Sequence, residues 1–277
     1  MIIRMPRMRH LALLFLLAFP LFITPVRADN FPVMNLSSRN SSVQLNPNSQ
    51  AGIYNWTVDG KDIMYQQWFW IRTGDSASEL PVDSAHLQLL KESAAGGSGA
   101  LLYKGSGYSV TIRFSLLGGA DGSKASDLSE IISIKNTSST ALGINFFQYA
   151  NIEFSKGDDT VQFLNPSTVQ QSGGGVYLDE TVVNSTGLVH HQADVYPAIL
   201  NSLNDGSATT LNDSNYATGD ATWGFQWQQM ITPGNTFTIT KDMNVSDPPP
   251  AVPEPTSVLL LGTLITFVAC SARKRYC

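Results

Sequence analysis

The body of this 277-residue chain is a succession of short segments in which apolar and polar residues alternate, each followed by a turn signal rich in Gly, Asn, Asp or Pro. Such alternation is typical of β-strands with one buried face. The one helical segment, 198–203, is too short to connect parallel strands. We therefore predict an all-β fold, a single antiparallel β-sandwich over 29–246, rather than an α/β fold. The expected strands are 53–58, 63–72, 108–117, 128–135, 143–154, 159–164, 175–183, 222–231 and 236–243.

Two details of this pattern give finer expectations. Segments 131–135 and 142–149 are separated by a short polar turn, which predicts a hairpin. Within 222–231, alternation places Trp223, Phe225 and Trp227 on one face, which we expect to be core.

Composition excludes several classes of function. The only cysteines are Cys270 and Cys277, so the body 29–251 has no disulfide, thiol nucleophile or cysteine-bound metal. That span has 10 Lys and Arg against 21 Asp and Glu, a net charge near −11. An acidic body repels phosphates, which argues against nucleic acid and anionic lipid as partners.

Residues 1–28 have the pattern of a cleaved secretory signal peptide. Three arginines within the first nine residues precede an apolar run over 11–19, and Val26-Arg27-Ala28 places small residues where signal peptidase cleaves. We expect the mature chain to start at Asp29. The alternative is an uncleaved anchor, although the run is shorter than the ~20 residues that span a bilayer.

The other end reads Val252-Pro253-Glu254-Pro255, an apolar run over 256–272, and Arg273-Lys274-Arg275 within the basic tail 273–277. The run would be a helix of about 25 Å, at the short end of the membrane-spanning range. The basic residues place the tail in the cytoplasm, so the body lies outside. Prolines keep the linker 247–255 extended.

These three elements, in this order and spacing, resemble a PEP-CTERM sorting signal. The resemblance covers about residues 252–277. It implies recognition by an exosortase, a membrane-embedded cysteine transpeptidase-like enzyme of bacteria that have an outer membrane and make exopolysaccharide. The recognised residues would be Val252, Pro253, Glu254, Pro255, Arg273, Lys274 and Arg275. It also implies anchoring in the inner membrane before processing, followed by location at the cell surface or secretion. A glycosylphosphatidylinositol signal would end apolar, and a sortase signal would carry a Leu-Pro-x-Thr-Gly box, which is absent.

The body shows no catalytic motif. His190, His191 and Asp194 are of metal-ligating types, but neighbouring residues of a strand face opposite sides, so no metal site is assigned. The acidic pairs Asp158-Asp159 and Asp179-Glu180 lie among turn residues, and the sequence does not place them in one cleft. We expect no cofactor; calcium at the Asp- and Asn-rich loop 204–215 is the alternative. There is no Gly-x-Ser-x-Gly elbow, and His86, His190 and His191 are the only histidines of the body.

The aromatic residues of 63–72 suggest a ligand platform. Gln66, Trp68 and Trp70 share one face of this strand, and flat rings beside amides suit stacking on sugars. The competing interpretation is that both faces are buried in a thick sandwich.

We therefore predict an exported surface or extracellular-matrix protein with a structural, adhesive or carbohydrate-binding role. Its expected partners are exosortase and extracellular polysaccharide. The alternative is a polysaccharide-acting hydrolase or lyase on the same scaffold, which needs a cleft that holds paired carboxylates.

Overall fold

A computed structural model describes residues 31–74, 78–84, 88–154 and 159–246. The predicted signal peptide, linker, apolar run and basic tail lie outside these ranges, as do His86 and Asp158. Along the described part of the chain, no helix is long and apolar enough to cross a bilayer.

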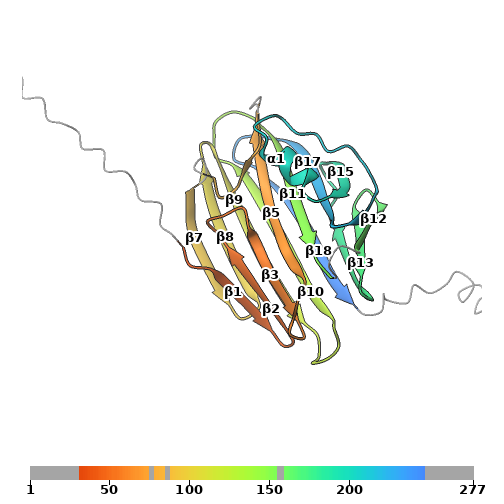
Figure 1. The fold of residues 1–277 in the computed structure, drawn as a ribbon. Helices are drawn as coiled ribbons and strands as arrows, with labels where there is room; N and C mark the ends of the chain where they lie inside the picture. Colours follow the sequence, from red (N-terminus) through yellow and green to blue (C-terminus); the bar gives the residue numbers. More distant parts are fainter. Residues whose placement is uncertain (1–30, 75–77, 85–87, 155–158, 247–277) are drawn as a thin grey trace, which may run out of the picture.

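Two sheets, A and B, pack face to face (Figure 1). Sheet A has the strand order β1-β2-β3-β5-β11-β17-β15, with β4 beside β3 and β6 beside β5. Its strands are β1 Met34–Ser38, β2 Ser41–Asn46, β3 Gly52–Val58, β4 Lys61–Asp62, β5 Met64–Thr73, β6 Leu80–Pro81, β11 Leu142–Ile152, β15 Leu188–Val195 and β17 Ala221–Ile231. Its neighbours are antiparallel except β3 and β5, which meet in parallel at Gln67.

Sheet B is antiparallel throughout, with the order β16-β12-β13-β14-β18-β10-β9-β8-β7. Its strands are β7 Gln88–Ala95, β8 Ser98–Gly105, β9 Tyr108–Gly118, β10 Ser126–Asn136, β12 Asp159–Asn165, β13 Thr168–Gly173, β14 Val176–Val182, β16 Tyr216–Gly219 and β18 Thr236–Ser246. The predicted antiparallel sandwich is confirmed. All nine expected strands are present, and the short helix is α1, Ala198–Asn204.

The predicted hairpin is wrong. Its first segment lies in β10 of sheet B and its second in β11 of sheet A, so the chain crosses between the sheets. The buried Asn136 fixes this crossing, since its Nδ2 donates to the carbonyl oxygens of Thr140 at 2.7 Å and Ile231 at 2.8 Å. The first bond holds the connection after β10, and the second ties it to the end of β17 in sheet A.

The core lies between the sheets and is rich in aromatic rings. All five tryptophans of the chain are 0% exposed. Trp223, Phe225 and Trp227 are among the buried rings, as alternation predicts. A cysteine-free fold obtains much of its stability from such burial, at roughly 25 cal/mol per Å² of apolar surface.

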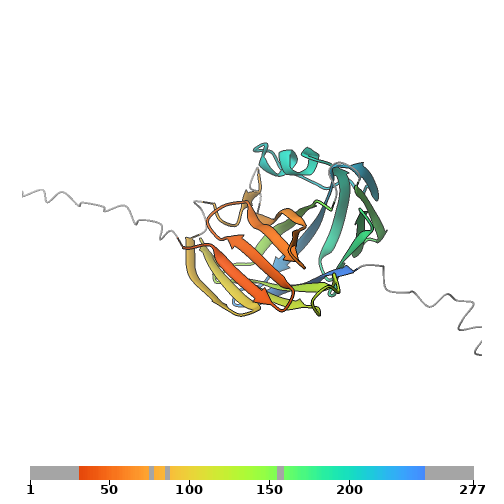
Figure 2. The same ribbon diagram turned by 60° about the horizontal axis from the view of Figure 1, so that its bottom comes forward.

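The outer face of sheet A is covered. Segment 78–84, helix α1 and the loop 205–215 lie over β5, β11 and β17; α1 is the teal helix outside the sheets in Figure 2. The cover is tied down by Glu79, which pairs with Arg72 at 3.1 Å and accepts the backbone N–H of Thr209 at 3.2 Å. Side chains on both faces of these central strands are therefore buried.

Candidate functional site

The predicted sugar platform on β5 is buried under this cover. Trp68 and Trp70 are 0% exposed and Gln66 is 8% exposed. The indole Nε1 of Trp68 donates to Asp83 Oδ1 at 2.7 Å, and that of Trp70 donates to Asn204 Oδ1 at 3.3 Å. Neither ring face is open to a sugar, so the predicted platform of Gln66, Trp68 and Trp70 is wrong. Trp68 and Trp70 bond the cover on sheet A, and Gln66 donates to the Gln50 carbonyl oxygen at 2.7 Å.

The exposed aromatic residue of β5 is Tyr65, which is 53% exposed. In the β5–β11 register, Gln66 lies opposite Asn151 and Met64 lies opposite Ile152, so Tyr65 is the extra residue of a β-bulge. Bulges reverse the expected alternation and re-aim side chains. Here the bulge turns a tyrosine outward beside a run of buried rings.

Tyr65 lines an open hollow of about 440 Å³ that we call the tyrosine hollow. It lies where β3, β4, β5 and the end of β11 meet. Two backbone hydrogen bonds join these segments, from the Ile63 N–H to Trp56 O and from the Glu153 N–H to Ile63 O. The Asp62 side chain accepts the Met64 N–H within the turn. The lining residues are Tyr54, Lys61, Asp62, Ile63, Met64, Tyr65, Glu153 and Phe154.

A second exposed tyrosine extends the tyrosine hollow. Tyr196, 38% exposed, packs edge-on against Tyr65 with ring centroids 6.0 Å apart. A hydrogen bond with Tyr65 raises the pKa of the Tyr196 phenol. The hollow thus combines aromatic surface with phenol hydroxyls and the exposed carboxylate of Glu153. The Lys61 ammonium is already engaged, donating to Phe154 O at 2.8 Å.

The two adjacent histidines share an aspartate other than the one expected. His190 Nδ1 is 2.9 Å from Asp213 Oδ2, and the backbone N–H of His191 donates to Asp213 Oδ1 at 3.2 Å. The His191 ring lies 2.7 Å from Asn215 Oδ1 through Nε2 and 3.6 Å from Asp213 Oδ1 through Nδ1, while Asp194 accepts from Gln192. Among the described residues, no group of three or more His, Cys, Asp or Glu side chains is placed to hold a metal ion.

The expected acidic pairs do not form a common cleft. Asp159 is buried and accepts from the Phe154 N–H and the Gln171 side chain. Asp179 faces outward and accepts from Gln170, whereas its neighbour Glu180 points into the core. Alternation along β14 explains this separation.

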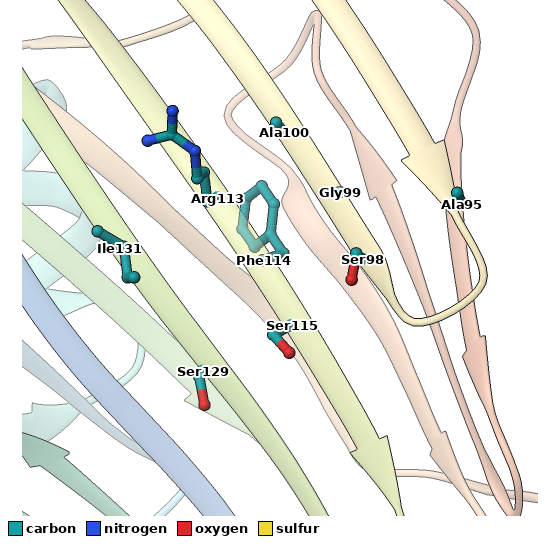
Figure 3. Close-up of a pocket in the computed structure, with 9 residues that line it drawn as sticks. All are labelled: Ala95, Ser98, Gly99, Ala100, Arg113, Phe114, Ser115, Ser129 and Ile131. Atoms are coloured by element: carbon teal, nitrogen blue, oxygen red, sulfur yellow. The ribbon is translucent and has the colours of Figure 1, made fainter.

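A second shallow hollow, of about 460 Å³, lies on the open outer face of sheet B (Figure 3). Figure 3 shows Arg113 and Ser115 on β9 beside Ser129 and Ile131 on β10. The Ser129 hydroxyl joins two carboxylates at this hollow, 2.6 Å from Asp242 Oδ1 and 3.1 Å from Asp127 Oδ1. Partial burial, followed by the charge of Asp242, raises the pKa of Asp127. Sequence reasoning missed this pair because its members are far apart in the chain.

Comparisons with known proteins define the fold class. No protein-family model and no curated protein matches the sequence. A bacterial glucoamylase complexed with acarbose is similar in structure over 83% of this chain, with TM-score 0.56 and 9% identity, and the chain spans only 34% of that protein. A putative aldose 1-epimerase from Escherichia coli K12 is similar over 78% of this chain and 99% of its own, with TM-score 0.50 and 10% identity.

A galactose mutarotase-like protein from Lactobacillus casei is similar over 77% of this chain and 100% of its own, with TM-score 0.50 and 5% identity. At these identities the likeness concerns the fold. The protein is a large two-sheet antiparallel β-sandwich of the architecture that these three structures share.

Proposed function

We propose that this is an exported bacterial surface or extracellular-matrix protein whose sandwich binds a neutral extracellular polysaccharide at the tyrosine hollow. The observation that carries the proposal is Tyr65, an aromatic ring turned outward by a β-bulge and extended by Tyr196. A ring with a polar end offers apolar surface to the C–H face of a sugar and a hydrogen bond to its hydroxyls.

The shape of the site favours a chain over a single small molecule. The tyrosine hollow is open, whereas small-molecule pockets enclose most of their ligand. A glycan chain running across the hollow would contact several rings at once, and each contact adds to the affinity.

Charge narrows the ligand class. The body has a net charge near −11, and Glu153 adds a carboxylate at the hollow itself. Repulsion would oppose a polyuronate or sulfated glycan. A neutral polysaccharide meets no such opposition.

The structural neighbours give coarser support. The three similar structures are a glucoamylase with bound acarbose, a putative aldose 1-epimerase and a galactose mutarotase-like protein. All three names refer to carbohydrate chemistry. A carbohydrate-related role on this scaffold is consistent with those neighbours, although fold alone does not assign an activity.

Binding is tested with the full-length protein by affinity electrophoresis in gels containing neutral or uronate-rich polysaccharides. We expect retardation in a neutral gel, and Tyr65→Ala to weaken it about tenfold, or ~1.4 kcal/mol. Tyr216→Ala removes a tyrosine that is 60% exposed on the edge strand β16 and does not line the tyrosine hollow, and should bind as the wild type does. Equal retardation of all three proteins would remove the hollow from the proposal.

The location is proposed from the C-terminal motif. Exosortase would recognise Val252-Pro253-Glu254-Pro255 while the apolar run holds the chain in the inner membrane. Glu254→Ala, or truncation after Ala251, should abolish processing and change the fraction of protein at the cell surface. If immunoblots of the cell fractions match the wild type, the motif is inert in this chain.

The enzymatic alternative has one feature in its favour, the carboxyl pair Asp127 and Asp242. These groups lie on an open sheet face and are bridged by a single hydroxyl, whereas glycosidases hold two carboxyl groups roughly 5–10 Å apart across a cleft. We therefore favour binding. Release of reducing ends from a bound polysaccharide, lost in Asp242→Asn, would reverse that preference.

A further inference from the structure

Lys241 lies in the interior of the sandwich against two glutamates. Glu130, Glu180 and Lys241 come from β10, β14 and β18 of sheet B, and all three side chains are fully buried. The Lys241 Nζ is 2.5 Å from Glu130 Oε2 and 2.7 Å from Glu180 Oε1. Glu130 is directly opposite Lys241 in the strand register, where facing Cβ atoms are about 5 Å apart. Both side chains are therefore long enough for the Lys241 amine to reach the Glu130 carboxyl group.

Sheet A closes this cluster from the other side. Gln67 Nε2 donates to Glu130 Oε2 at 3.3 Å, and Glu180 Oε2 accepts from Gln148 Nε2 at 2.9 Å and Trp223 Nε1 at 2.6 Å. The Lys241 Nζ is also 5.7 Å from the centre of the Phe69 ring. The side chains of Glu130, Glu180 and Lys241 are therefore closed to bulk water.

The balance of charge favours a neutral carboxylic acid here. Two carboxylates and one ammonium would leave a net negative charge in an apolar interior, which is strongly disfavoured. Burial raises the pKa of Glu130 in opposition to the nearby Lys241. Burial alone would lower the pKa of Lys241, but the two glutamates outweigh it and the pKa is raised. Glu180 accepts hydrogen bonds from Lys241, Gln148 and Trp223, whereas Glu130 Oε1 has no hydrogen-bond partner among the described residues. We therefore place the proton on Glu130 and the negative charge on Glu180.

We propose that Glu130 and Lys241 condense into an intramolecular amide, an isopeptide bond that joins β10 to β18 within the core. Glu180 is the proton carrier of this reaction. The dry site favours the amide because water, the product and the reagent of the reverse reaction, is excluded.

Each atom of the step has a place in the cluster. Glu180 takes one proton from Nζ, and the freed amine attacks Glu130 Cδ to form the Nζ–Cδ bond. The Gln67 N–H is placed to stabilise negative charge on Oε2. Glu180 then gives its proton to the Oε1 hydroxyl and takes the second Nζ proton, the Cδ–Oε1 bond breaks, and water leaves. The product is a neutral amide beside a neutral Glu180, so no net charge is created.

Peptide mapping tests the bond. The full-length protein is unfolded, digested with trypsin and examined by mass spectrometry. We expect peptide 125–135, which contains Glu130, to be linked to a peptide that spans Lys241 uncleaved, with a combined mass lower by one water. Trypsin requires a free lysine amine, so cleavage after Lys241 together with free 125–135 would overturn the proposal.

Two conservative variants separate the chemistry from folding. Glu180→Gln keeps the side-chain size and removes the proton carrier, so its peptides should be unlinked while circular dichroism still reports a β fold. Asp121→Asn changes an exposed carboxylate outside both sites and should leave the link intact. Full linkage in Glu180→Gln would overturn the role of Glu180. If that variant does not fold, the wild-type peptide map alone decides whether the bond exists.

Discussion

Replacing Trp68 by phenylalanine keeps a ring on β5 and removes the indole N–H that Asp83 accepts at 2.7 Å. A hydrogen bond to a charged group contributes about 1.5–3 kcal/mol. The smaller ring leaves unfilled space in a fully buried site, which adds about 1 kcal/mol. We expect the free energy of unfolding to fall by ~3 kcal/mol at about pH 8, which is far above the ordinary pKa of an aspartate.

The loss should shrink in acid. Burial raises the pKa of Asp83 in the folded protein, and the Trp68 N–H opposes that rise. Without this donor the folded pKa rises further. A carboxyl group with a raised folded pKa destabilises the fold at pH values above that pKa, and the penalty disappears as the group is protonated. The difference between variant and wild type should therefore be smaller at about pH 4.5 than at about pH 8.

Urea unfolding followed by circular dichroism measures this difference. Asp83→Asn provides the control background, since it removes the charge that the indole N–H stabilises. In that background Trp68→Phe should cost its packing contribution and a neutral hydrogen bond to the amide oxygen that replaces the Asp83 carboxylate, together about 2 kcal/mol, with no dependence on pH. If the loss is the same at both pH values, or undiminished in Asp83→Asn, the bond from Trp68 to Asp83 does not hold the cover on sheet A.

Two further predictions concern stability. Partial burial and then the charge of Asp242 raise the pKa of Asp127, so the ionised pair destabilises the fold at pH values above that pKa. Asp127→Asn should therefore raise the melting temperature at neutral pH. At about pH 3 both carboxyl groups are protonated, and the variant should give no gain. A Cβ on Gly52 would lie 2.3 Å from Gln67 O and from a Trp68 ring carbon, whereas Gly60 also has positive φ but nothing within 4 Å. Gly52→Ala should therefore lose more than about 3 kcal/mol and Gly60→Ala about 1 kcal/mol in urea unfolding, and equal losses would contradict the close approach of β3 to β5.

Alternation predicts nine of the eighteen described strands; those not predicted are β1, β2, β4, β6, β7, β8, β13, β15 and β16. Among them, β13 (TVQQSG) has one large apolar side chain, Val169, which is enough to reach the core but too little to form a pattern. In contrast, β2 and β8 do alternate between buried and less buried residues, and that signal was overlooked. The hairpin failed for a different reason. Adjacent segments usually pair, but here the crossing between sheets depends on Asn136 bonding to Ile231, 95 residues away.

The sequence does not reveal the tyrosine hollow because the exposure of Tyr65 depends on a strand pairing between distant parts of the chain. Alternation along β5 correctly separates Trp68 and Trp70 from Phe69, but the bulge that exposes Tyr65 arises from pairing with Asn151 and Ile152 of β11. The burial of Lys241, in contrast, was visible in the sequence. It shares the inward face of its strand with Ile239 and Met243, so alternation alone places a lysine in the core.

The position of β18 governs the order in which the sandwich can be completed. It is the last described strand along the chain, yet it lies in the middle of sheet B, between β14 and β10. Until it is in place, both neighbours present unpaired edges, which are templates for aggregation. Glu180 also lacks its counter-ion, the Lys241 ammonium, until β18 is in place. Under the export proposed above, sheet B would close only after residue 246 has crossed the membrane, and slow export would prolong the exposure of an incomplete sheet.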